Sequence, residues 1–107
     1  LFNATGCQGC HVPELEPGLV AFTDLLLHDM GESLSDSLPS QFAGPSEWRT
    51  APLINVGLNE RFLHDGRATT LEEAILWHGG EAAASREAFR ALNSEAKHRL
   101  IEFLFAL

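Results

Sequence analysis

The residues best suited to chemistry are two cysteines and a histidine near the start of the chain, in the run Cys7-Gln8-Gly9-Cys10-His11. A Cys-x-x-Cys-His run is the attachment signature of c-type haem. Residues three apart lie on one face of a helix, so both thiols can reach the two vinyl groups of one porphyrin. His11 then lies under the iron as the proximal ligand. The motif predicts one covalent haem c, which also implies extracytoplasmic, periplasmic maturation.

Three other interpretations of the two cysteines are weaker. A thioredoxin-like redox pair stands in a strand–helix–strand context, and no such alternation follows the motif. A structural zinc site needs a second pair of Cys or His ligands, and the chain has no third Cys. A disulfide between residues three apart closes a very short loop and stabilises little. A haem-free zinc or dithiol module is thus the less favoured alternative, and metal analysis of the purified protein would distinguish it from a haem domain.

A low-spin haem iron needs a second axial ligand, usually Met or His. His78 lies on the apolar face of a predicted helix, beside two glycines, and is the preferred candidate. Met30 is the only methionine, and packing is its competing role. His64 sits in a predicted turn, where a supporting hydrogen bond is the expected role and ligation the less favoured one. His28 is expected to be a loop residue that makes a hydrogen bond, and His98 is expected to be exposed to solvent. Ligation by His11 and His78 predicts a lower reduction potential than His/Met ligation.

Length and composition limit the possible classes of protein. The chain has 107 residues and a formal charge of −8, which predicts one domain over residues 1–107 with a modest core. Because 45% of the residues are hydrophobic, intrinsic disorder is not expected. No apolar run approaches the roughly 20 residues needed to span a bilayer. The acidic balance argues against nucleic-acid binding. The chain starts with Leu1 rather than Met, so we expect a processed or excised piece of a larger protein.

The charge is unevenly distributed along the chain. Residues 1–48 hold seven acids and no Lys or Arg, whereas residues 49–107 hold eight acids and seven bases. One part of the surface should therefore be strongly negative. Such a surface favours a basic redox partner, because opposite charges steer encounter. A simple bias toward solubility is the competing explanation.

The middle of the chain is expected to be loop. All five prolines fall between Pro13 and Pro52, and this spacing is typical of turns. Long loops in small domains usually have a function or surround a bound group. A haem is a suitable group for this loop to surround. The apolar run 25–27 is predicted to be a brief strand or a buried turn.

The last third of the chain is expected to be helical. Thr70-Leu-Glu-Glu73 is a capping box, and Leu71, Ala74, Ile75 and His78 then share one face. Glycines at 79 and 80 end this helix. Two further helices are predicted, and their expected caps and inner residues are Ser85 with Ala88, Phe89 and Leu92, and Ser94 with Leu100, Ile101, Leu104 and Phe105.

The motif near the N-terminus completes a predicted all-α, cytochrome c-like domain whose long loops wrap the haem. Asn3 or Thr5 can cap the helix that carries the cysteines. In cytochrome c folds the first and last helices cross. Here that would pair the helix around Phe2 with the helix around Leu104.

Several segments resemble a known superfamily. They are Phe22-Thr-Asp-Leu-Leu-Leu-His-Asp-Met-Gly31, Ala51-Pro-Leu-Ile-Asn-Val-Gly-Leu-Asn-Glu-Arg-Phe-Leu-His-Asp-Gly66 and Thr70-Leu-Glu-Glu-Ala-Ile75. Together with the haem motif they resemble the carboxy-terminal haem domain of the di-haem cytochrome c peroxidase superfamily. The similarity is greatest to the branch named di-haem oxidoreductase or thiol oxidoreductase. The haem motif alone is generic, whereas the His-Asp-Gly turn followed by Thr-Leu-Glu-Glu-Ala is more specific.

The resemblance implies a function for the haem, and this sequence differs from the superfamily pattern in three ways. In the superfamily this haem passes electrons to a second haem, in another domain, where peroxide is reduced. The usual axial Met position is occupied here by His78. The Leu-Arg-Asn-Val often found before the turn reads Leu53-Ile-Asn-Val56, so Arg49 or Arg67 would have to replace that Arg. The chain has only one haem motif, so a second haem domain of the parent protein is an expected partner.

We therefore predict a mono-haem c-type cytochrome domain that carries single electrons. The expected haem-packing side chains are Phe62, Leu71, Ile75 and Trp77. Either Arg49 or Arg67 could pair with a haem propionate, since guanidinium suits carboxylates. The alternative is one part of a di-haem peroxidase or oxidoreductase, in which this haem feeds or performs peroxide reduction. Since haem attachment consumes both cysteines, the thiol oxidoreductase label does not imply thiol chemistry here.

Overall fold

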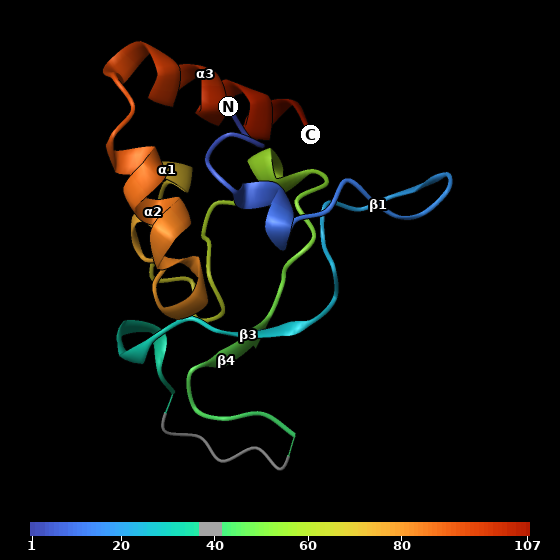
Figure 1. Ribbon diagram of the computed structural model, residues 1–107, viewed down its shortest axis with the longest axis vertical. Helices are drawn as coiled ribbons and strands as arrows, with labels where there is room; N and C mark the ends of the chain where they lie inside the picture. Colours follow the sequence, from blue (N-terminus) through green and yellow to red (C-terminus); the bar gives the residue numbers. More distant parts are fainter. Residues whose placement is uncertain (37–41) are drawn as a thin grey trace.

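The computed structural model describes residues 1–36 and 42–107, and it contains strands as well as helices (Figure 1). The prediction of an all-α fold is therefore wrong. The elements in chain order are η1 (Cys7–Gly9), β1 (Glu14–Glu16), β2 (Leu19–Val20), β3 (Leu27–Asp29), η2 (Glu32–Leu34), β4 (Glu47–Arg49), η3 (Val56–Leu58), α1 (Leu71–Leu76), η4 (Gly80–Ala82), α2 (Ala83–Arg90) and α3 (Ser94–Ala106), where η marks a 3₁₀ helix.

The strands form two small antiparallel ribbons, β1–β2 and β3–β4. In the second ribbon His28 lies opposite Trp48, within a register that runs from Leu27–Arg49 to Asp29–Glu47. Strands of two or three residues show no clear alternation of polar and apolar side chains. They exist because paired segments satisfy each other's backbone hydrogen bonds, across a short turn for β1–β2 and across a distant part of the chain for β3–β4. The part of the predicted loop at residues 37–41 lies outside the described residues.

The predicted helices of the last third are present with shifted ends. Thr70 caps α1 as expected, because its hydroxyl accepts a hydrogen bond from the Glu73 amide at 3.0 Å. The expected cap Ser85 instead lies inside α2, which begins directly after η4. Asn93 rather than Ser94 caps α3, since its side-chain oxygen accepts from the Ala96 amide at 2.8 Å.

The core joins both ends of the chain. Phe2 packs on Phe103 of α3 with ring centroids 5.3 Å apart, so the expected contact between the first and last segments is present. The N-terminus lies beside α3 (Figure 1). However, residues 2–6 form turns rather than an α-helix. The buried hydrophobic cluster consists of Phe2, Val56, Phe62, Ala68, Leu71, Ala74, Phe89, Leu100 and Leu104.

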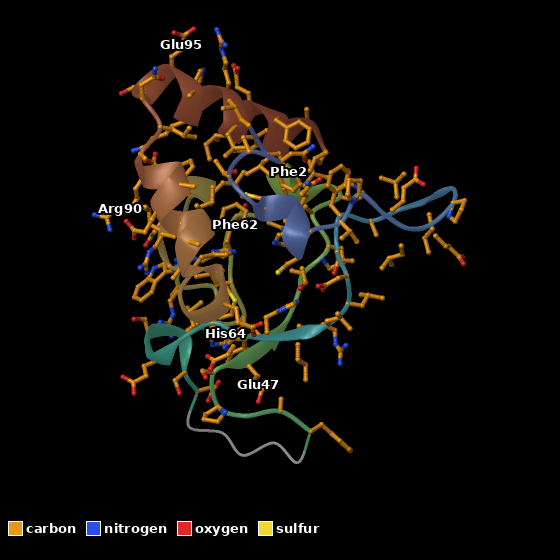
Figure 2. All side chains as sticks on the ribbon, in the orientation of Figure 1. Phe2, Glu47, Phe62, His64, Arg90 and Glu95 are labelled. Atoms are coloured by element: carbon orange, nitrogen blue, oxygen red, sulfur yellow. The ribbon has the colours of Figure 1, made fainter. Side chains whose placement is uncertain are left out.

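Side chains at the surface complete the arrangement. Figure 2 shows Phe2 and Phe62 directed inward, whereas Arg90 and Glu95 point away from the body of the protein. Phe105 of the predicted α3 stripe is 57% exposed. Leu25 and Leu26 are exposed too, so the apolar run at 25–27 is not buried, and only its last residue begins β3. Among the described residues no helix is both long and apolar enough to cross a bilayer.

Candidate haem-binding site

The cysteine motif lies on the 3₁₀ helix η1 and the residues that follow it. Neither Asn3 nor Thr5 caps this helix. Thr5 donates its hydroxyl backward to the Leu1 carbonyl at 2.8 Å. A 3₁₀ helix has three residues per turn, so side chains at positions i and i+3 lie one above the other. Cys7 and Cys10 are both half-buried and are not joined by a disulfide. The Cys10 amide donates to the Cys7 carbonyl at 3.3 Å, so the two cysteines are one 3₁₀ turn apart on the same face of this turn, as attachment to one porphyrin requires.

His11 is oriented by a backbone carbonyl. Its Nδ1 lies 3.0 Å from the oxygen of Phe22. A carbonyl can only accept a hydrogen bond, so Nδ1 carries the proton and the lone pair is on Nε2. Phe22 has a φ of 54°, which is unusual for a bulky residue and typical of positions where function constrains the backbone. This conformation helps to direct the Phe22 carbonyl toward the imidazole.

His78 is held by the same kind of contact. It follows α1, and its Nδ1 donates to the Ala74 carbonyl at 2.8 Å. The backbone amide of His78 donates to the Ile75 carbonyl at 3.1 Å. This hydrogen bond continues the helical turn beyond Leu76, the last residue of α1. The lone pair is again on Nε2. Metal-bound histidines usually donate their other ring nitrogen to a carbonyl or carboxylate in this way.

The electrostatic environment favours neutral imidazoles. Burial is the largest influence on the pKa of His11 and lowers it, as does the charge of His78. The carbonyls of Phe22 and Ala51 and the carboxylate of Asp24 raise this pKa, but the net shift is downward. Burial also lowers the pKa of His78, opposed by the Ala74 carbonyl. The charge of His78 is thus among the influences on the pKa of His11, so the two predicted ligands lie within electrostatic range of each other. A neutral imidazole is the form that binds a metal.

Cys10 is not activated as a nucleophile. Burial, followed by the charges of Asp24, Glu81 and Cys7, raises the pKa of the Cys10 thiol above its ordinary value. Reactive redox cysteines have lowered pKa values, because the thiolate is the reacting form. This environment therefore disfavours the dithiol alternative.

Several partly buried side chains pack against the edge of the core cluster, and Cys7 of the motif is among them. Cys7, Phe22, Leu53, Leu63, Ile75 and Trp77 are partly buried and pack against the core cluster. We call this set the apolar rim. Two of the expected haem-packing residues, Ile75 and Trp77, belong to it. The other two, Phe62 and Leu71, are buried within the core itself, at 8% and 6% exposure.

Nothing in the sequence pattern marks Phe22, Leu53 or Leu63 as site residues. Phe22 and Leu63 both have positive φ angles, which no residue pattern announces. A cavity of about 780 Å³ also lies between the segment 59–62, the start of α1 and α3, and Phe62 and Leu71 line it. Of the ligand candidates, only the exposed His98 lines that cavity, whereas His11, His78, Met30 and His64 do not.

The two candidate arginines make different contacts. Arg49 of β4 is exposed, and its guanidinium bonds the Leu25 carbonyl. Arg67 pairs with Asp65 at 2.8 Å, donates to the Ser33 carbonyl at 2.6 Å and lies over the Trp77 ring at 4.8 Å. Arg67 therefore adjoins the apolar rim through Trp77, whereas Arg49 is attached to the segment before β3.

The other predicted ligand candidates are separately placed. His64 stacks on Trp48 with ring centroids 3.7 Å apart, and its Nε2 lies 3.8 Å from Asp65. Met30 follows β3, where its carbonyl lies close to Gly79, the residue after His78. His98 is exposed on α3 and pairs with Glu102 at 3.2 Å.

One group of donors was missed by sequence reasoning. Ligand atoms of Cys10, Asp24 and His28 lie within 4.8 Å of one another, so the structure offers three donors of the types that zinc accepts. His28 and Asp24 are already paired at 2.7 Å. The hydrogen bond to Asp24 is the largest influence that raises the pKa of His28. The chain spacing alone could not show this proximity, because Asp24 and His28 approach Cys10 only through the fold.

Comparison with known families places the chain. A family model described as di-haem oxidoreductase, putative peroxidase, matches residues 16–107. The chain belongs to this family. The match confirms the predicted superfamily, and it begins after the Cys-x-x-Cys-His run. No curated protein and no solved structure matches the chain. The family implies haem binding and oxidoreductase chemistry, and its di-haem description indicates a second haem domain in the parent protein.

Proposed function

We propose that this chain is a mono-haem c-type cytochrome domain that transfers single electrons. In this proposal the thiols of Cys7 and Cys10 form the thioethers, and Nε2 of His11 and of His78 bind the iron. The observation that carries the proposal is the shared tethering of the two imidazoles. Each donates Nδ1–H to a backbone carbonyl, at 3.0 Å for His11 and 2.8 Å for His78, and so presents the lone pair of Nε2.

The residues of the chain have distinct roles in this proposal. Cys7 and Cys10 would hold the haem by thioethers, for which the S–H of each thiol would add across one vinyl group, with sulfur bonded to one carbon and hydrogen to the other. The lowered pKa values of His11 and His78 keep both ligands neutral. When bound, the haem supplies reversible one-electron chemistry at iron. The apolar rim would shield the haem from water, and Arg67 or Arg49 would neutralise a propionate.

The second candidate is a part of a di-haem peroxidase, in which this haem feeds or performs peroxide reduction. The description of the matching family favours it. Coordination separates the two functions. A domain closed by His78 binds exogenous ligands slowly, whereas a peroxide-reducing haem requires an accessible iron position.

The proposal has a direct spectroscopic test. The chain is produced with a c-type maturation system, and the haem is measured after alkaline pyridine treatment and reduction. We expect a haem c spectrum that persists through acid–acetone extraction, and a Cys7→Ala/Cys10→Ala double variant that loses it. Absence of haem c from the purified wild-type chain would refute the proposal. Stoichiometric zinc in its place would support the site at Cys10, Asp24 and His28.

The sixth ligand is tested in the same preparation. His78→Ala should convert the ferric protein to the high-spin form and accelerate cyanide binding, while Met30→Leu should leave both unchanged. An unchanged His78→Ala spectrum, together with a changed Met30→Leu spectrum, would transfer the role to Met30. Rapid cyanide binding by the wild type would favour the peroxidase alternative.

Localisation and partner complete the proposal. Covalent haem attachment of this type takes place outside the cytoplasm, so we place the protein in the periplasm. We also propose a basic redox partner, because residues 1–48 carry seven acids without a Lys or Arg. Haem staining of periplasmic and cytoplasmic fractions tests the location, and a signal confined to the cytoplasm would contradict it.

A further inference from the structure

A group of side chains outside the proposed ligand set joins the segment after His78 to β3. Glu81 of η4 accepts the Asp29 amide at 2.5 Å through Oε2, and its Oε1 lies 3.4 Å from Nδ1 of His28. The other nitrogen of His28 lies 2.7 Å from Oδ2 of Asp24. We call Asp24, His28 and Glu81 the carboxylate clamp. The imidazole of His28 bridges the two carboxylates, so the clamp crosses from the segment 24–29 to η4.

The backbone around the clamp is closely packed. A side-chain carbon added at Gly80 would lie 2.2 Å from the Asp29 carbonyl oxygen, and one at Gly79 would lie 2.9 Å from that of Met30. Gly80 also has a φ of 52°, which favours glycine. The two residues after His78 therefore lie directly against the end of β3. Only the absence of side chains at these two positions allows the backbone to approach so closely.

His78 is thus held from two sides. On its N-terminal side the six-residue helix α1 supplies the Ala74 carbonyl. On its C-terminal side two glycines offer little conformational restraint of their own, and the next side chain is Glu81. That side is restrained by the close approach of Gly79 and Gly80 to the end of β3, and by the contacts of the Glu81 carboxylate with His28 and with the Asp29 amide.

We propose that Glu81 is a positioning residue which, through the carboxylate clamp, holds His78 in place and keeps the sixth coordination position closed. The inference rests on the proposed function, in which His78 ligates the iron. It goes further because it assigns the closure to residues that do not touch the iron. Weakening the clamp should let His78 leave more often while His11 and both thioethers stay in place.

The test uses the haem-loaded chain and three variants. Glu81→Ala removes both contacts, whereas Glu81→Gln keeps an oxygen for the Asp29 amide but loses the charge that faces His28. Glu102→Ala is the matched control, because Glu102 also pairs with a histidine, His98, at 3.2 Å but lies on α3. The readouts are the ferric spin state and the cyanide association rate.

The expected order is clear. Cyanide association should rise on the order of fivefold in Glu81→Ala, less in Glu81→Gln and not at all in Glu102→Ala. The high-spin fraction should follow the same order. Equal rates in wild type, Glu81→Ala and Glu81→Gln would overturn the inference. Should Glu81→Ala not fold, the comparison of Glu81→Gln with wild type decides by the same criterion.

A parallel His78→Ala variant separates this inference from the proposed function. If His78→Ala opens the iron while the Glu81 variants do not, the clamp is not what positions His78, and the ligand assignment stands. If His78→Ala leaves spectrum and rate unchanged, the ligand assignment itself fails, and the inference fails with it.

Discussion

Replacement of Thr70 by alanine tests whether the short helix α1 is held by its N-terminal cap. Helices of this length are unstable alone in water, and α1 has six residues. The Thr70 hydroxyl accepts from the Glu73 amide at 3.0 Å, and Glu73 accepts in return from the Thr69 amide at 2.9 Å. Because the helix end is exposed, water partly replaces the lost acceptor. We expect the free energy of unfolding to fall by about 1 kcal/mol, and Tm to fall by roughly 5 °C.

Urea denaturation followed by circular dichroism measures this loss. Thr70→Ser retains a hydroxyl and should restore most of the stability. Ser94→Ala serves as the control, because Asn93 rather than Ser94 caps α3. The reasoning is refuted if Thr70→Ser and Thr70→Ala lose the same stability, since the hydroxyl would then have no specific role.

The cap also has an expected effect at the opposite end of α1. In the haem-loaded chain, 1 kcal/mol less stability in α1 raises the population of its opened form by up to about fivefold. Cyanide binding that waits for His78 to leave should accelerate by the same factor. A loss of stability in Thr70→Ala without any change in cyanide binding would show that His78 is held independently of α1.

Three further outcomes follow from the structure. Asn93→Ala should lower the free energy of unfolding by about 1 kcal/mol while Ser94→Ala leaves it nearly unchanged; the reverse order in urea titrations would contradict the assigned cap. Hydrogen bonds from the Thr69 amide and hydroxyl lower the pKa of Glu73 in the folded protein. These hydrogen bonds therefore stabilise the fold at a pH above the ordinary pKa of glutamate, and their stabilisation is lost as the pH falls through the lowered pKa. The stability gap between wild type and Glu73→Gln should therefore narrow on acidification below about 4.5, and a gap independent of pH would exclude this linkage. Electron transfer to a basic redox protein should slow as salt is added, because ions screen the acidic segment 1–48; stopped-flow rates insensitive to ionic strength would count against electrostatic docking.

The helices could be predicted from the sequence because their signals are local. The spacing of Leu71 and Ala74 identifies the buried face of α1, and Thr70 lies where a cap is needed. The sequence suggested a brief strand only at residues 25–27, which overlaps β3 at Leu27 alone, because β3 and β4 are three residues each and are stabilised by pairing with each other. The predicted cap of α3, Ser94, differs from the observed cap, Asn93, by one position. Both residue types are good caps, and only the backbone conformation selects between them.

The candidate site divides in the same way. The motif at Cys7, Cys10 and His11 could be identified from spacing, and the preference for His78 came from the face of its helix. The partners of the two imidazoles could not be identified, since they are backbone carbonyls. That of Phe22 depends on a positive φ angle that a bulky side chain rarely adopts. The carboxylate clamp was also unseen, because Glu81 meets His28 across 53 residues of chain.

The close packing of Gly79 and Gly80 against β3 also affects how this site could be moved into another protein. Because neither glycine leaves room for a side-chain carbon, the segment after His78 and the segment 29–31 fit only each other. A designer who grafts the His78 loop onto a new scaffold must therefore transfer both strips of backbone as one part. By the same reasoning, sequences that diverge from this one can change the two strips only together.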